Sequence, residues 1–138
     1  MAQTEVITNT GIAELINLWA GVAASKLSKI VALNKATVVT AAVGSTFAAP
    51  GSSSAHHTDS GLAIQAIDTV AGATVNTAGD TITFDHVLTA TATKNVAGVQ
   101  ICNDDGDVAF GECGFNSVLA AENTDTVTID GQCTIDQA

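Results

Sequence analysis

The sequence of 138 residues contains no arginine and only four lysines against 14 acidic residues, which gives a formal net charge of −10 at pH 7. Three of the lysines, Lys26, Lys29 and Lys35, lie close together, so Lys94 is the only lysine among residues 36–138. A nucleic-acid-binding protein needs several cations along the phosphate backbone, because neutralising the phosphates provides much of its affinity. The composition therefore argues against a nucleic-acid partner.

Long apolar runs are also missing. The two most apolar segments, Ile12–Ala24 and Ile30–Val43, are interrupted by polar residues and fall short of the ~20 apolar residues that a bilayer-spanning helix requires. The first residues show no basic region followed by an apolar run, so no secretory signal is visible. We therefore expect synthesis in the cytoplasm without a signal peptide, and no membrane partner.

The three cysteines, Cys102, Cys113 and Cys133, are an odd number and lack the spacing of a zinc site. If residues 103–107 form a hairpin turn, Cys102 lies opposite Ala109 and Cys113 lies near Gly98, which is too far apart for a disulfide. We therefore expect reduced, partly buried thiols.

Near the N-terminus, four apolar residues recur at the spacing of one helical face: Ile12, Leu15, Ile16 and Trp19. We predict a helix over residues 11–20, with Asn9 or Thr10 as its N-cap and Glu14 in its first turn. Gly21 follows the last apolar position. An isolated helix of this length is marginal in water, so its apolar face must be covered by a sheet or by a neighbouring subunit.

The rest of the chain, in which most of the 19 threonines lie, favours β-strands. Alternation is clearest in Thr81–Thr93, where Ile82, Phe84, His86 and Leu88 share one face and threonines dominate the other. The other expected strands are Ser28–Leu33, Ala36–Val43, Leu62–Asp68, Val96–Cys102, Val108–Cys113 and Asp125–Ile135.

Residues 44–61 form a long loop rich in serine and alanine that contains the only proline, Pro50. Such loops are usually functional or ordered by a partner. Together these features predict one domain over residues 1–138. Its fold is an antiparallel β-sandwich of about seven strands with one short N-terminal α-helix.

The order of segments resembles small virion structural proteins of tailed bacterial and archaeal viruses, commonly labelled tail-fibre or tail-fibre-like proteins. The matching segments are Val6–Gly11 opening a helix, Thr58–Leu62, Thr81–Thr93, Val96–Asn103, Val108–Gly111 and the closing strand Thr124–Ile135. Gly111 and Glu112 stand where the family has an Ala-Arg pair. The resemblance implies a non-enzymatic building block of a virus particle that is used in multiple copies.

His56, His57 and Asp59, next to Ser52–Ser54, supply the residue types of a catalytic triad. A triad depends on directed hydrogen bonds between groups that separate elements of the fold usually hold, so adjacency in sequence does not indicate catalysis. The two histidines and the aspartate could contribute to a metal site between subunits. The interpretation we favour is a polar loop that contacts a neighbouring subunit.

The segment Asn103–Asp107 contains Asp104, Asp105 and Asp107, which could hold Ca²⁺, but its spacing does not fit an EF-hand. An ordinary Asp-Gly hairpin turn is the favoured interpretation. We expect His86 to be a hydrogen-bonded core histidine or an inter-subunit contact, and Trp19 to be a buried anchor at a subunit or domain contact.

The leading hypothesis is a virion structural protein that forms a homo-oligomer and either decorates the capsid or builds the tail or a tail fibre. Its partners would be itself, other virion proteins and, as an open alternative, a host-surface receptor, with no cofactor and no catalytic residues. The candidate subunit contacts are Ile12, Leu15, Ile16, Trp19, Pro50, His56 and His57.

Two alternatives remain open. A carbohydrate-binding or Ca²⁺-dependent adhesion module would use the acidic turn, but tyrosine is absent and Trp19 lies in the expected helix. A small hydrolase would use His56, His57 and Asp59.

Overall fold

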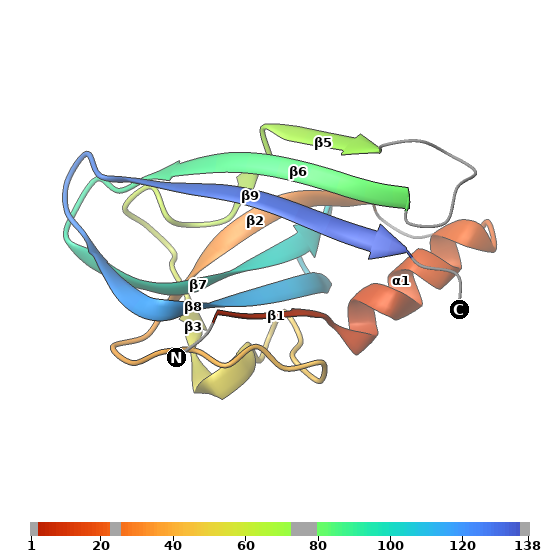
Figure 1. The fold of residues 1–138 in the computed structure, drawn as a ribbon, viewed down its shortest axis with the longest axis horizontal. Helices are drawn as coiled ribbons and strands as arrows, with labels where there is room; N and C mark the ends of the chain where they lie inside the picture. The colour runs from red at the N-terminus through yellow and green to blue at the C-terminus, as the bar shows by residue number, and fades with distance from the viewer. Residues whose placement is uncertain (1–2, 23–25, 73–79, 136–138) are drawn as a thin grey trace.

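The computed structural model describes residues 3–22, 26–72 and 80–135, which form two antiparallel β-sheets and one α-helix. Figure 1 shows the sheets as two layers, with α1 (Asn9–Trp19) at one end. The prediction of a mainly β, antiparallel sandwich with one short N-terminal helix is confirmed. Within the described ranges, no helix has the length and apolar character needed to cross a bilayer.

The larger sheet has the strand order β1-β8-β7-β2-β3, and β4 also pairs with β2. Its strands are β1 (Thr4–Ile7), β2 (Leu27–Asn34), β3 (Ala55–His56), β4 (Gln65–Ala66), β7 (Lys94–Asn103) and β8 (Ala109–Ala121). The smaller sheet has the order β5-β6-β9, with β5 (Thr69–Gly72), β6 (Asp80–Thr89) and β9 (Thr126–Ile135). A short 3₁₀ helix, η1 (Gly51–Ser53), lies in the loop between β2 and β3.

The core between the sheets follows from alternation along the strands. On β6, Phe84, His86 and Leu88 are buried, whereas Val87 is 44% exposed, as the sequence pattern predicts. The buried apolar residues of this core come from both sheets and their connections: Ile30, Ala32, Leu62, Phe84, Leu88, Ala90, Val96, Val99, Ile101, Ala121 and Val127. A second, smaller cluster on the other face of the larger sheet consists of Leu33, Val39 and Ala97, with Val118 packed against them.

The predicted strand Ala36–Val43 is wrong, because this segment has no strand structure. Its β-branched residues suggest pairing, but its backbone groups bind side chains instead. The Thr40 N–H donates to Ser52 Oγ at 2.8 Å, and the Ala41 N–H donates to Thr4 Oγ1 at 2.9 Å. Val39 packs into the smaller apolar cluster. Burial of this side chain therefore holds the segment in place without hydrogen-bonded strand pairing.

Other boundaries also differ from the expectation. Leu62–Asp68 contains only the two-residue β4, and β5 was not predicted. The strand expected to end at Cys113 continues to Ala121, because residues 119–121 pair with the start of β7. The loop expected over residues 44–61 contains η1 and β3.

Helix α1 begins two residues earlier than expected, and its N-cap is Thr8 rather than Asn9 or Thr10. Thr8 Oγ1 accepts a hydrogen bond from the Gly11 N–H at 3.0 Å, and Glu14 consequently lies beyond the first turn. At the other end, Gly21 adopts a φ of 68°, and the N–H groups of Gly21 and Val22 close the helix on the Leu18 and Asn17 carbonyls. This Schellman arrangement explains the glycine after the last apolar position.

Two of the connections between the sheets, β6–β7 and β8–β9, lie at the same end of the sandwich, opposite α1 (Figure 1). There the Ala90 N–H donates to the Asp125 carbonyl, and the Thr124 N–H donates to the Ala90 carbonyl, each at 2.8 Å. These bonds hold the β6–β7 and β8–β9 connections together, so this end of the sandwich is closed.

In the β6–β9 ladder, Gly131 lies opposite Phe84. A Cβ at position 131 would lie 1.9 Å from Phe84 Cζ, so the ring occupies the space that a side chain would need. Gly131→Ala should therefore displace the ring and lower the free energy of unfolding by about 1–3 kcal/mol, as for other overpacked sites. Urea unfolding measures the change.

The matched control is Gly72→Ala in the same sheet, where a Cβ meets nothing within 4 Å. That variant should change the stability by less than about 0.5 kcal/mol. Equal stability of the two variants would contradict the role of Phe84 in covering Gly131.

Candidate functional site

The structure does not bring His56, His57 and Asp59 together. Each side chain has its own partner within the chain at 2.8–3.0 Å: Gln100 for His56, the Asn95 carbonyl for His57, and Lys94 for Asp59. In the described ranges, no group of three or more His, Cys, Asp or Glu side chains could hold a metal ion. These bonds engage Nε2 of each histidine and one carboxylate oxygen of Asp59 with three separate partners rather than with one another.

The acidic segment forms a hairpin turn built around Asn103. Asn103 Oδ1 accepts hydrogen bonds from the N–H groups of Gly106, Asp107 and Val108, each at 3.0 Å. The Asp107 carboxylate accepts from Asn103 Nδ2 at 2.8 Å, and the Asp104 carboxylate accepts from Ser28 Oγ at 2.7 Å. The hairpin interpretation is confirmed, and two of the three candidate calcium ligands, Asp104 and Asp107, take part in the turn.

The cysteines Cys102 and Cys113 are not bridged. Cys102 lies opposite Ala109, as predicted, and Cys113 pairs with Val99, next to Gly98. Burial raises the pKa of Cys102 to about 12 and that of Cys113 to about 11, so both thiols stay protonated at neutral pH. The side chain of Cys133 lies outside the described part of the structure.

His86 lies in the core, where the sequence placed it. Its Nδ1 is 3.0 Å from a carboxylate oxygen of Asp68, although neither ring nitrogen makes a well-directed hydrogen bond. The same Asp68 oxygen accepts from the Val87 N–H at 3.2 Å, so one carboxylate fixes both the strand and the ring.

The sequence analysis missed a buried carboxylate, Glu112 on β8, which is 2% exposed. Its oxygens accept hydrogen bonds from Ser45 Oγ at 3.1 Å, from the Gly51 N–H at 3.0 and 3.2 Å, and from Gln100 Nε2 at 2.9 Å. No lysine is among these partners, so neutral donors stabilise the charge. The register expected from the turn places Gln100 opposite Gly111, but a register shift between Ile101 and Cys102 brings Gln100 opposite Glu112.

The network continues from Gln100 to the loop over residues 44–61. Gln100 Oε1 accepts from His56 Nε2 at 2.9 Å, and Phe47 lies against the His56 ring with centroids 4.3 Å apart. Burial lowers the pKa of His56, an effect that the Gln100 hydrogen bond and the Glu112 charge oppose. The cluster therefore fastens the loop to the outer face of the larger sheet, and its buried carboxylate has no access for a substrate.

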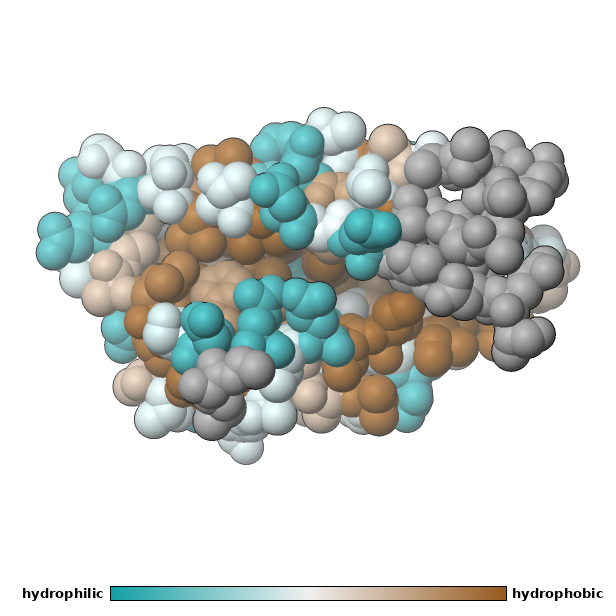
Figure 2. Space-filling model, in the orientation of Figure 1, coloured by the Kyte–Doolittle hydropathy of each residue, from teal (hydrophilic) through white to brown (hydrophobic). Residues whose placement is uncertain are grey.

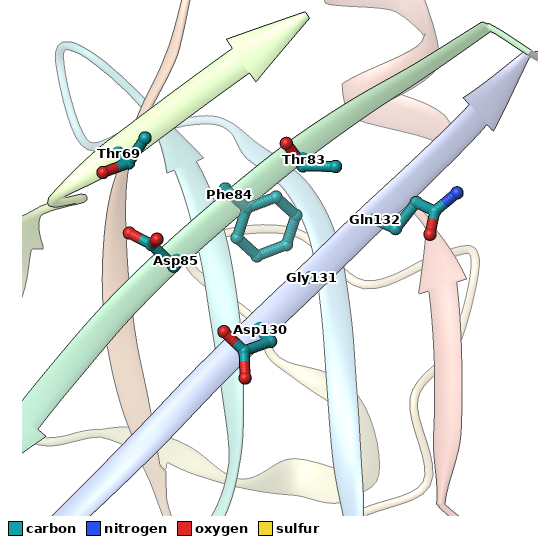
Figure 3. Close-up of a pocket in the computed structure, with 7 residues that line it drawn as sticks. All are labelled: Thr69, Thr83, Phe84, Asp85, Asp130, Gly131 and Gln132. Carbon is teal, nitrogen blue, oxygen red and sulfur yellow. The ribbon is translucent and has the colours of Figure 1, made fainter. Parts of the chain in front are cut away.

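A shallow depression of about 300 Å³ lies on the outer face of the smaller sheet (Figure 3). Asp85 and Asp130, which form a cross-strand pair, are on its rim, and the Phe84 ring lies between them and Gln132. Like charges in this position repel each other. Two carboxylates without further acidic partners provide a weak basis for a cation site.

Three of the four apolar residues of the predicted helical stripe face solvent. Ile12 is 46%, Ile16 58% and Trp19 84% exposed, so the expectation that Trp19 is a buried anchor does not hold within one chain. Leu15, at one edge of the stripe, is half-buried. Of the remaining contact candidates, Pro50 and His56 are half-buried, and His57 is buried.

Next to α1, an apolar groove of about 1280 Å³ separates the two sheets. Figure 2 shows it as a hollowed brown band between the layers, which continues onto the end of the molecule where α1 lies. Its apolar lining includes Leu15 and Leu18 of α1, Phe115 and Leu119 of β8, and Val127 and Ile129 of β9. The sandwich is therefore incompletely closed along this side.

Comparisons of the chain with protein-family models, with curated proteins and with solved structures find no match. The site must therefore be interpreted from its own residues. The described residues offer two buried polar sites, one around Glu112 and Gln100 and one around His86. They also form one large apolar surface, which consists of α1 and the groove.

Glu112→Gln replaces the carboxylate with an amide, whose NH₂ group must face donors on one side. At least one buried donor then loses its acceptor, and we expect the free energy of unfolding to fall by about 1–3 kcal/mol. Urea unfolding measures the loss, and amide hydrogen exchange should increase around Ser45 and Gly51. The matched control is Glu122→Gln, at an exposed position. A similar loss of stability in both variants would contradict the role of Glu112 in holding the loop.

The lowered pKa of His56 predicts a pH dependence of stability. In the unfolded chain His56 has its ordinary pKa of 6.5, whereas the folded chain binds this proton less readily. Its contribution is therefore fully present above pH 6.5 and is lost as the pH falls through the folded pKa. Between pH 7.5 and 5.5, the stability of the wild type should decrease more steeply than that of His56→Gln, and parallel curves would exclude this role.

Proposed function

We propose that the chain is a non-enzymatic structural protein of a tailed virus, which assembles in several copies on the particle as a capsid decoration or as a component of the tail or tail fibre. The observation that carries the proposal is the exposed stripe of Ile12, Ile16 and Trp19 on α1. The sequence resemblance supports the same role.

Burial of this stripe would be energetically significant. Fully covering a large apolar side chain contributes about 1.5–3 kcal/mol, so covering the exposed parts of these three contributes on the order of 4 kcal/mol. A stripe at the i, i+4 and i+7 positions of one helix is the pattern with which amphipathic helices dock into apolar surfaces. A partner surface therefore fits the stripe better than solvent does.

The distribution of charge supports contact through the same region. The chain carries a formal net charge of −10, so two copies repel each other wherever their acidic surfaces meet. Within α1 only Glu14 is charged. Association through this helix brings few like charges together and leaves the acidic surface in solvent.

A non-enzymatic role agrees with the state of the reactive side chains. The candidate histidines and Asp59 are bound within the fold, and the thiols have raised pKa values. The partners we propose are further copies of the chain and other virion proteins, with a host-surface receptor as a further partner. The low number of cations speaks against nucleic acid.

One observation favours the alternative of a carbohydrate-binding module, because an exposed tryptophan can stack on a sugar ring. Sugar sites also need precisely placed polar groups around the ring. The other residues of the stripe on α1, Ile12 and Ile16, are apolar, so the surroundings of Trp19 suit a protein surface better.

Trp19 is the only tryptophan, so its fluorescence reports directly on association. At assembling concentrations its emission should lie at shorter wavelength than after dilution. Trp19→Lys should lower the molar mass measured by light scattering, whereas Val43→Lys, at a position 55% exposed and outside the groove, should leave it unchanged. A wild type that is monomeric at every concentration and never co-purifies with particles would contradict the proposal, and a blue shift on adding sugar to dilute protein would favour the alternative.

A further inference from the structure

Strand β9 is the longest sheet edge among the described residues and has few protective features. It pairs with β6 over ten consecutive residue pairs without a register shift, and its other edge has no partner strand among the described residues. The other edge strands are short, with four residues in β1, four in β5 and two in β3. Natural proteins usually protect an edge with charged side chains, especially lysine, with proline or with a bulge. Strand β9 has no lysine, proline or bulge, and Asp130 is its only charged residue.

The apolar groove lies directly beneath this edge. Val127 and Ile129 point inward from β9, and Ile129 is only half-buried because Phe115 and Leu119 across the groove do not close over it. A strand added beside β9 would extend the smaller sheet over this opening. It would also satisfy the backbone groups of the edge, as in β-strand addition.

We propose that the added strand is β9 of a second copy, so that two three-stranded sheets join antiparallel into one continuous sheet and the two grooves close against each other. This inference rests on the proposed function, in which copies of the chain associate, and it identifies the surface they use. A twofold contact of this kind is self-complementary, because the same edge serves both copies.

Side-chain direction and charge restrict the register, and the register we propose is centred on Ile129. Residues opposite each other in a ladder point to the same face, so even-numbered residues of β9, which point outward, must face even-numbered residues of the second copy. A pair centred on Asp130 would place two carboxylates opposite each other and is disfavoured. Centring on Ile129 instead places each Thr128 hydroxyl opposite an Asp130 carboxylate and brings the two Ile129 side chains together over the grooves.

The exposed area is consistent with a missing partner. The chain exposes 7267 Å², whereas about 6600 Å² is expected for a compact monomer of its 13.8 kDa mass. The excess of about 650 Å² indicates a more open surface than that of a compact monomer, and an interface of standard size buries roughly 800 Å² of each partner. A second copy on the open side would cover an area of this order.

The test uses opposite charges at the centre of the proposed contact. In Ile129→Lys, two ammonium groups would face each other across the twofold axis, and in Ile129→Glu two carboxylates would do so. Light scattering should show that the mass of each variant falls to roughly half that of the wild type. An equal mixture of the two variants should regain the wild-type mass, because opposite charges then meet, and this recovery excludes misfolding as the cause.

Val43→Lys is the control, since it makes the same kind of change on an exposed residue outside the groove. If Ile129→Lys keeps the wild-type mass, or if the mixture does not recover it, the β9 contact is overturned. If the β9 contact is overturned but the Trp19→Lys variant has a lower mass than the wild type, association in several copies stands and only the β9 contact falls. A wild type that is always monomeric removes both proposals.

Discussion

The packing of the β6–β9 ribbon against the larger sheet is the contact on which the rest of the molecule depends. Phe84, Leu88 and Val127 of the ribbon meet Ile30 and Val99 of the larger sheet in the core. At the end opposite α1, two connections bonded to each other hold the layers together. Toward α1 the layers separate, which creates the groove. Along the groove, β9 pairs with β6 on one side and has no second partner strand among the described residues.

Glu112 imposes a second constraint, on the outer face of the larger sheet. An isolated buried charge is costly, and removing one of its hydrogen-bond partners costs more than the bond contributes. The loop over residues 44–61 must therefore adopt one conformation, because Ser45 and Gly51 supply donors to this carboxylate. A Cβ at position 51 would lie 2.3 Å from Glu112 Oε1, so only glycine allows the loop to come this close.

Local patterns in the sequence predicted those parts of the fold that are governed by neighbouring residues. Alternation gave the faces of β6, the Asp-Gly turn gave the hairpin and the Cys102–Ala109 pair, and spacing gave α1 and its glycine stop. A register shift between Ile101 and Cys102, which the turn does not predict, moves the rest of the hairpin by one residue. Ala36–Val43 was misassigned because its partners are side chains distant in sequence, Ser52 and Thr4. The burial of Glu112 was missed for the same reason, since the loop that covers it is more than 60 residues away.

The stripe on α1 and the edge of β9 have different consequences for assembly. A twofold β9 contact is isologous, so by itself it stops at a pair. The stripe of Ile12, Ile16 and Trp19 belongs to another element and remains exposed on the outer side of α1. A pair joined at β9 would therefore still present two apolar stripes. In the virion role proposed above, docking of each stripe on another copy or on a different particle protein would build the pair into a ring or a shell, the arrangement that this proposal requires.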